Sequence, residues 1–222
     1  MDLAALISQY RSDAKDRVSP YLATRADVVM WLNEAQNEAC MRKRLLRLAD
    51  NATYCDIAVT AGTASYSLNA VWAWVDRVDW LQDGETEPVK LPICTVAFLD
   101  RYRPTWRTAV TQPEFVIITD HQLQLGCIPE TAGDLTLEGY RLPTVPIEDA
   151  ADESPEIHVS HHRHLVKWLL FRAFSRPDSQ LYNPDGAAKA MAEFDAYFGL
   201  PVDADRRRDQ VQDMPQVNEC YF

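Results

Sequence analysis

Four of the five histidines of the chain lie within seven positions, in the stretch IHVSHHRHL of residues 157–165. They are His158, His161, His162 and His164. Clustered imidazoles suit two kinds of chemistry, because a neutral imidazole binds metal ions and an imidazole also gains or loses a proton near neutral pH. His158 and His162 have the i,i+4 spacing that zinc sites use on a helix.

A zinc enzyme of the HExxH kind also needs a glutamate between its two histidines as general base. Here the intervening residues are Val159, Ser160 and His161, and no partner motif supplies a third ligand. The sequence therefore favours ordinary histidines on a helix face, partly buried and hydrogen-bonded. A metal-dependent enzyme that uses His158 and His162 is the alternative, and metal analysis of the purified protein distinguishes the two.

Other catalytic signatures are missing from the sequence. The seven glycines are dispersed and form neither a GxGxxG nor a GxxxxGK[ST] phosphate-binding loop. No GxSxG nucleophile motif occurs, and the five cysteines include no CxxC pair. We therefore predict that the protein is not an enzyme and needs no cofactor and no metal.

The composition bounds the class of protein. The chain has 222 residues, 47% of them hydrophobic, which is enough for a sizeable core. Its formal net charge of −11 opposes tight binding to a nucleic acid backbone or to an acidic membrane surface. No apolar run reaches the 18 residues of a membrane-spanning helix, and the cysteine pattern suits a reducing cytoplasm.

Hydrophobic periodicity predicts four main helices, at about residues 3–16, 24–46, 154–174 and 183–199. Alternating apolar residues and short turns predict a mostly antiparallel, β-rich middle. The predicted fold class is α+β, with three parts. They are a four-helix bundle of residues 1–50 and 151–199, a β-rich insertion of residues 51–150, and an extended C-terminal arm of residues 200–222.

Capping signals fix where the helices should begin. Thr24 with Asp27 resembles a capping box. Ser154, Pro155 and Glu156 suit the first positions of the third helix, and Asn183 followed by a proline suits the fourth. The apolar stripes of three helices predict a common core that includes Trp31, Leu32, Leu165, Leu169 and Phe194.

The β-rich middle carries one hairpin signal at Asp83-Gly84 and further turns near residues 120–121 and 131–134. A short helix, VAFLDRYRPTW, should end at Pro104. Three tryptophans lie in the predicted strands: Trp72, Trp74 and Trp80. No basic residues are interleaved with them as in a nucleic-acid-binding surface, so we expect them to pack in the core or at a subunit interface and not to stack on bases. A monomeric binding module built on these strands is an alternative function, and a measurement of the size of the purified protein would distinguish it because such a module would not form rings.

Two basic runs interrupt the acidic chain. Arg42-Lys43-Arg44 closes the second helix, where cations suit the helix dipole. The other run lies in the polar C-terminal arm, whose basic triplet and terminal aromatic pair form a candidate docking element. The residues of this candidate interface are Arg206, Arg207, Arg208, Met214, Tyr221 and Phe222.

Four pieces of the sequence, taken in order, resemble the head-to-tail adaptor (connector) proteins of tailed bacteriophages. They are ATRADVVMWLNEAQNEA, TASYSLNAVWAWVDRVDWL, the segment from LDRYRPTW to EGYRLP, and IHVSHHRHLVKWLLFRAF. The likeness covers about residues 1–200. The sequence departs from the pattern at Ser67-Leu68-Asn69, where a proline commonly follows the leucine, and at Ile128-Pro129-Glu130, which has one proline rather than two.

The resemblance implies a helical bundle with a β-rich insertion, assembled as a twelve-subunit ring. Such a ring binds the phage portal protein on one side and tail or nozzle proteins on the other, and genomic DNA passes through it without specific binding. It also implies a protein without catalytic residues, made in the host bacterial cytoplasm and located in the virion at the head-tail junction. The arm is the part least like the family.

Overall fold

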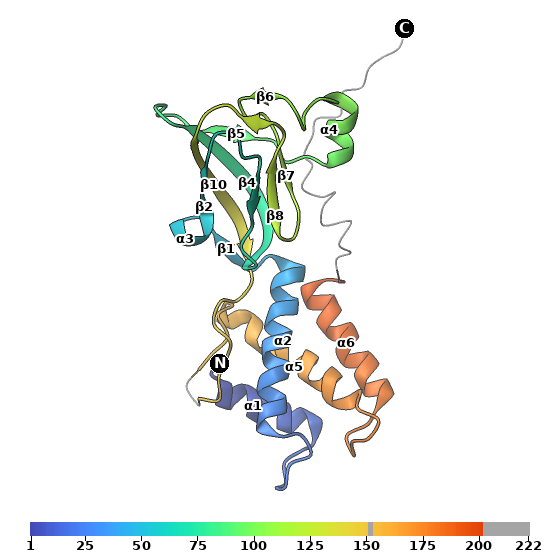
Figure 1. The fold of residues 1–222 in the computed structure, drawn as a ribbon. Helices are drawn as coiled ribbons and strands as arrows, with labels where there is room; N and C mark the ends of the chain where they lie inside the picture. The colour runs from blue at the N-terminus through green and yellow to red at the C-terminus, as the bar shows by residue number, and fades with distance from the viewer. Residues whose placement is uncertain (151–152, 202–222) are drawn as a thin grey trace. The chain divides into compact units, whose positions relative to one another are not determined.

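The computed structural model describes residues 1–150 and 153–201 and shows a mixed α+β fold (Figure 1). The chain divides into two compact units. The helical unit contains residues 1–46 and 141–201, and the β unit contains residues 47–140. The α+β fold class predicted from the sequence is confirmed.

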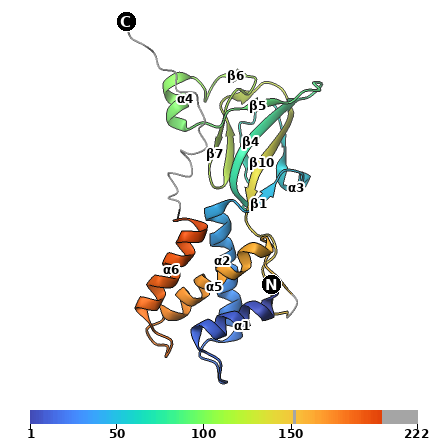
Figure 2. The ribbon, with the colours of Figure 1, turned by 180° about the vertical axis from the view of Figure 1, so that it is seen from behind.

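The helical unit contains four helices that share one hydrophobic core. They are α1 (Leu3–Ala14), α2 (Arg25–Lys43), α5 (Val159–Phe174) and α6 (Pro184–Phe198). Helix α5 contacts each of the other three, and it crosses α2 in both views of the ribbon (Figures 1 and 2). The five side chains predicted for this core are all buried: Trp31, Leu32, Leu165, Leu169 and Phe194.

The predicted caps of α2 and α6 are confirmed. Thr24 and Asp27 form a reciprocal capping box at the start of α2. The Asn183 side chain accepts a hydrogen bond from Gly186 N, and Pro184 opens α6. The core face of α6 consists of Ala187, Ala190, Phe194 and Phe198.

The predicted start of α5 is wrong, because its N-cap is His158 rather than Ser154. Long-range hydrogen bonds hold the preceding residues in another conformation. Glu156 N donates to Gln36 Oε1 at 2.7 Å. The Glu156 carboxylate accepts hydrogen bonds from the backbone N–H groups of Thr144 and Val145 and pairs with Arg141 at 2.6 Å. These contacts outweigh the local helix-start signal.

Helix α2 also ends earlier than its periodicity predicts. Arg44 adopts a left-handed conformation with φ 51°, which closes the helix after Lys43. Leu46 then begins the short strand β1 (Leu46–Leu48) instead of continuing the helix. The chain therefore leaves the helical unit directly along a strand of the β unit.

The β unit contains three groups of hydrogen-bonded strands. The largest sheet has the order β1-β10-β4-β5, with β2 also paired to β10, and the others are β3-β8-β7 and the parallel pair β6-β9. The strands beyond β1 are β2 (Asp56–Val59), β3 (Ser65–Ser67), β4 (Trp72–Gln82), β5 (Val89–Leu91), β6 (Val110–Thr111), β7 (Val116–Ile118), β8 (Gln122–Leu125), β9 (Ile128–Pro129) and β10 (Gly133–Arg141).

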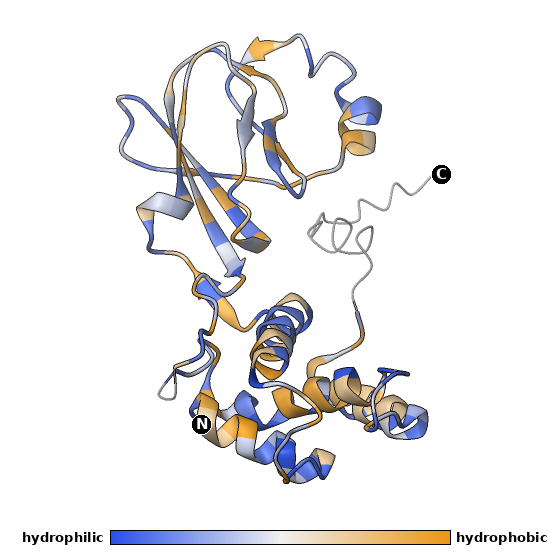
Figure 3. Ribbon diagram, turned by 60° about the horizontal axis from the view of Figure 1, so that its bottom comes forward, coloured by the Kyte–Doolittle hydropathy of each residue, from blue (hydrophilic) through white to orange (hydrophobic). Residues whose placement is uncertain are grey.

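The core of the β unit lies between its sheets, and hydrophobic and hydrophilic residues alternate along the strands (Figure 3). Trp72, Trp74 and Trp80 are all buried in this unit. The predicted hairpin at Asp83-Gly84 joins β4 to β5. Two short helices complete the unit, α3 (Ala52–Cys55) and α4 (Val96–Tyr102), and α4 ends before Pro104 as predicted.

Candidate functional site

The histidine cluster lies at the start of α5, where its four members take different roles. His158 precedes the helix, and its Nδ1 accepts a hydrogen bond from Ser160 N at 3.3 Å. His162 is buried in the helical core. Its Nε2 lies 2.8 Å from the carbonyl oxygen of Ile157, and its Nδ1 lies 2.8 Å from the carbonyl oxygen of Met1. Both nitrogens of His162 therefore lie within hydrogen-bonding distance of backbone groups, Nε2 of the Ile157 carbonyl and Nδ1 of the amino group and carbonyl of Met1.

The remaining two histidines pack against one tyrosine of α6. His161 Nδ1 lies 3.0 Å from the hydroxyl oxygen of Tyr197. His164 stacks on the same tyrosine, with ring centroids 3.4 Å apart and planes 6° apart. Lys43, at the end of α2, donates a hydrogen bond to the Tyr197 carbonyl at 2.8 Å and lies over its ring. This aromatic cluster ties α5 to α6 and α2.

The pKa values of His161 and His164 are both lowered. Burial is the largest cause for each, because it disfavours the charged imidazolium. Nearby cations lower them further, chiefly Lys43 for His161, and Arg163 followed by Lys43 for His164. The environment therefore favours neutral imidazoles, and the cluster acts as helix packing.

Within the described residues, no group of three or more His, Cys, Asp and Glu side chains is arranged to hold a metal ion. The structure places His164 with His161 against Tyr197. Residue spacing did not predict that Tyr197 and Lys43 contact these histidines, because both lie far from them along the chain. The histidines thus do not form one site, because His162 lies in the core whereas His161 and His164 contact Tyr197 of another helix.

The described cysteines are unsuited to nucleophilic or redox chemistry. Four are buried and free: Cys40, Cys55, Cys94 and Cys127. Burial raises the pKa of the Cys40 thiol to about 12 and that of the Cys94 thiol to about 11. Since the thiolate is the reactive form, these side chains behave as small apolar groups.

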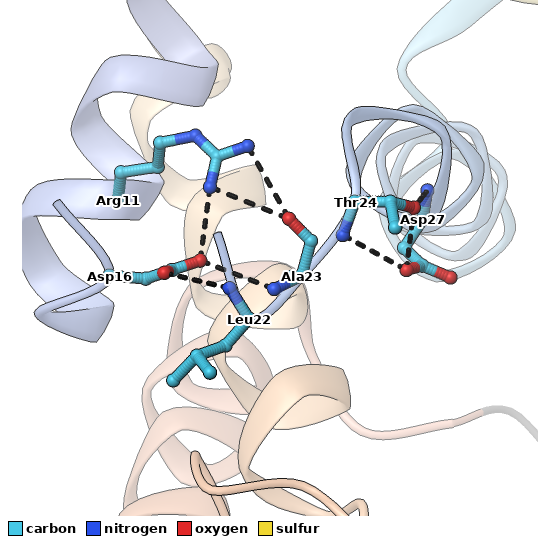
Figure 4. A network of polar contacts seen from close by, with 6 residues as sticks. All are labelled: Arg11, Asp16, Leu22, Ala23, Thr24 and Asp27. Atoms are coloured by element: carbon cyan, nitrogen blue, oxygen red, sulfur yellow. Dashed lines mark hydrogen bonds and ion pairs between the residues drawn. The ribbon is translucent and has the colours of Figure 1, made fainter. Parts of the chain in front are cut away.

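The connection between α1 and α2 is held by a buried ionic network (Figure 4). The Asp16 carboxylate accepts hydrogen bonds from Leu22 N at 3.0 Å and Ala23 N at 3.2 Å. It also pairs with Arg11 at 3.0 Å, and both side chains are nearly inaccessible to solvent. The Arg11 guanidinium in turn lies 3.5 Å from the ring centroid of Tyr21. No pattern in the sequence predicted this network.

That connection presents apolar side chains to solvent. Val18, Tyr21 and Leu22 are exposed although the segment around them is fixed by Asp16. Ordered loops with exposed apolar groups commonly contact other proteins. The connection is therefore suited to an interaction rather than to chemistry.

Negative charge is concentrated in the β unit. Residues 47–140 contain thirteen Asp and Glu but six Lys and Arg, a net charge of −7 out of the −11 of the chain. Three of the six basic residues fall between positions 101 and 107. The unit therefore has an uneven charge distribution, which matters for the contacts it makes with charged partners.

The candidate interface residues of the arm lie outside the described residues: Arg206, Arg207, Arg208, Met214, Tyr221 and Phe222. Among the residues that the structure does describe, no helix is long and apolar enough to span a bilayer. The described surfaces and clusters thus offer packing and contact rather than an assembled catalytic centre.

A family model described as SU10 adaptor protein matches residues 1–217. The match extends over the helical unit and the β unit. No curated protein matches the chain.

Proposed function

The chain belongs to the SU10 adaptor protein family, and on this premise we propose that it is the head-to-tail adaptor of a tailed phage. The family assignment confirms the general part of the resemblance seen in the sequence, a structural adaptor of a phage virion rather than an enzyme. The role that we propose is more specific than this assignment. Identical subunits form a ring that joins the portal to the tail and leaves a passage for DNA.

The observation that carries this proposal is the extent of the family match, which takes in both units and most of the C-terminal segment. The histidine cluster supports it, because His161 and His164 pack α5 against Tyr197 of α6. The buried, weakly acidic thiols support it in the same way.

We propose twelve subunits per ring, with the C-terminal arm of residues 200–222 reaching the portal or a neighbouring subunit. Its terminal Tyr221 and Phe222 offer large apolar area for anchoring, and the triplet Arg206 to Arg208 offers charge. The opposite side of the ring would contact tail or nozzle proteins.

The charge of the chain suits a passage that does not retain DNA. Twelve copies at −11 each give about −130, a field that repels a polyanion near the wall of the passage. Screening at physiological salt confines this field to within about 8–10 Å of the wall. A basic wall would instead hold DNA through counterion release.

The test is made in the phage that encodes the chain. Particles from an infection without this gene should be filled or partly filled heads that lack tails, and plasmid-encoded protein should restore tailed, infectious particles that contain it. Purified wild-type virions without this protein, or normal tails in its absence, would contradict the proposal.

A further inference from the structure

Two surfaces of the β unit carry opposite charge. The acidic turn, defined as residues 83–89, contains Asp83, Glu85 and Glu87 and no basic residue. The arginine segment, defined as residues 96–110, contains Arg101, Arg103 and Arg107 and a single acidic residue, Asp100. The rest of the unit is acidic, so the arginine segment stands out from its surroundings.

The acidic turn is well fixed and fully exposed. Gly84 has φ +88°, which lets Glu85 N donate to Gln82 O at 3.0 Å and close the turn. Asp83 N donates to the carbonyl oxygen of Ala132 at 3.1 Å, which anchors the turn to the neighbouring connection. Within the residues that the structure describes, the three carboxylates form no ion pair. They are therefore available to a cationic partner.

The arginine segment is anchored by a small hydrophobic core. Leu99 and Trp106 are buried in a small core with Cys94 and Ile117, so α4 and the turn after it have a defined position. The Trp106 indole N–H donates to Asp100 at 2.9 Å, which fixes the segment further. The arginine side chains project from a rigid base.

The three guanidinium groups differ in how they are paired. Arg103 pairs with Glu114 at 2.6 Å and Arg107 pairs with Asp100, and all four of these side chains are about half exposed. Arg101 lies over the Tyr102 ring and forms no ion pair with the described part of the chain. The segment keeps a net positive charge even when Glu114 is counted.

Exposed apolar side chains accompany both surfaces. The large hydrophobic side chains that are exposed in the β unit are four, and all belong to these two surfaces: Val89 at the acidic turn, and Val96, Tyr102 and Val110 in the arginine segment. Apolar area next to complementary charge is the composition of protein–protein interfaces, where aromatic residues and arginine are enriched.

The two surfaces lie at opposite edges of the β unit, as both views of the ribbon show (Figures 1 and 2). One chain cannot bring them together, but each chain can offer one surface to each of two neighbours. A contact between two different patches is heterologous, and heterologous contacts close into rings when the rotation per subunit allows it.

We infer that the acidic turn of one copy docks on the arginine segment of the next copy. The inference rests on the proposed ring and identifies the surfaces that hold it together. A second copy is the occupant that the charges favour, because an unrelated partner would need only one of the two surfaces.

The test uses two charge-reversed variants of the full chain. The turn variant carries Glu85→Lys and Glu87→Lys, and the segment variant carries Arg101→Glu and Arg103→Glu. A control with Asp50→Lys and Glu130→Lys changes the net charge as much as the turn variant does, at exposed positions outside both surfaces. Oligomer mass is measured by native mass spectrometry over a range of concentrations, with and without the portal protein.

Wild type and control should assemble, whereas each variant alone should associate at least about tenfold more weakly, because like charges then meet. An equimolar mixture of the two variants should assemble again, since the lysines of one variant meet the glutamates of the other in alternation. Recovery in the mixture also shows that both variants are folded.

Two results would overturn the inference. Variants that assemble like wild type would place the subunit contact elsewhere while the proposed ring stands. Impaired variants without recovery in the mixture would mean that the two surfaces meet different partners. A wild type that never assembles, even with the portal, would refute the proposed ring itself.

Discussion

At the scale of single residues, the histidines show how one pattern can hold several roles. His162 is a buried core residue with both nitrogens next to backbone groups, whereas His161 and His164 contact Tyr197 from α6. Sequence spacing predicted a shared helix face, and it could not show which neighbour each ring would meet. Tyr197 comes from a helix 36 positions away from His161, so the pairing depends on tertiary packing.

The lowered pKa values of His161 and His164 predict a pH-dependent stability. The folded protein favours neutral imidazoles at these positions, so their contribution to stability is present above the ordinary histidine pKa of about 6.5. It should be lost as the pH falls from there through the lower pKa values of the folded state. We expect His164→Phe, which keeps a ring against Tyr197, to reduce this acid sensitivity, as measured by thermal unfolding between pH 7 and about pH 5.

A matched control is His121→Phe, which removes an imidazole at an exposed position of the β unit, outside the histidine cluster. Equal acid sensitivity in wild type and His164→Phe would contradict this prediction, because it would show that His164 has the same pKa in the folded and unfolded states.

Leu169 tests the helical core. It is fully buried on α5, so Leu169→Ala should lower the free energy of unfolding by about 2–5 kcal/mol. Val159→Ala on the same helix, at an exposed position, should cost less than about 0.5 kcal/mol. Denaturant unfolding followed by tryptophan fluorescence measures both. A loss under about 0.5 kcal/mol for Leu169→Ala would contradict the buried position.

At the scale of elements, local signals predicted the helices and turns whose determinants are close in sequence. The capping box of Thr24, the Asn183-Pro184 start of α6 and the Asp83-Gly84 hairpin are confirmed. The start of α5 was wrong because Glu156 bonds to Gln36, Thr144 and Val145 instead of entering the helix. Such contacts join distant parts of the chain and leave no periodic trace.

The connection between α1 and α2 depends on one carboxylate. Asp16→Ala should leave the buried Arg11 guanidinium and two backbone N–H groups without their partner, so we expect a loss of about 3–5 kcal/mol in the free energy of unfolding. Asp13→Ala removes a carboxylate whose hydrogen bond with Gln9 is exposed to solvent, so it should change stability by less than about 0.5 kcal/mol. Similar unfolding curves for the two variants would mean that the network does not hold the connection.

At the scale of the whole molecule, the proposed function gives the C-terminal arm of residues 200–222 a role in binding the portal. We expect deletion of residues 213–222, which removes Met214, Tyr221 and Phe222, to weaken binding to the portal because the apolar anchors are lost. The melting temperature of the subunit should stay unchanged. Surface plasmon resonance on immobilised portal compares the truncated and full chains. Equal affinities would remove the arm from the portal interface.

Electron microscopy of the purified protein mixed with the portal protein of the same phage is a direct test of the proposed ring. We expect a ring of twelve subunits stacked coaxially on the portal, with a continuous central passage. Portal particles without added density, or added protein bound as scattered single subunits, would contradict it.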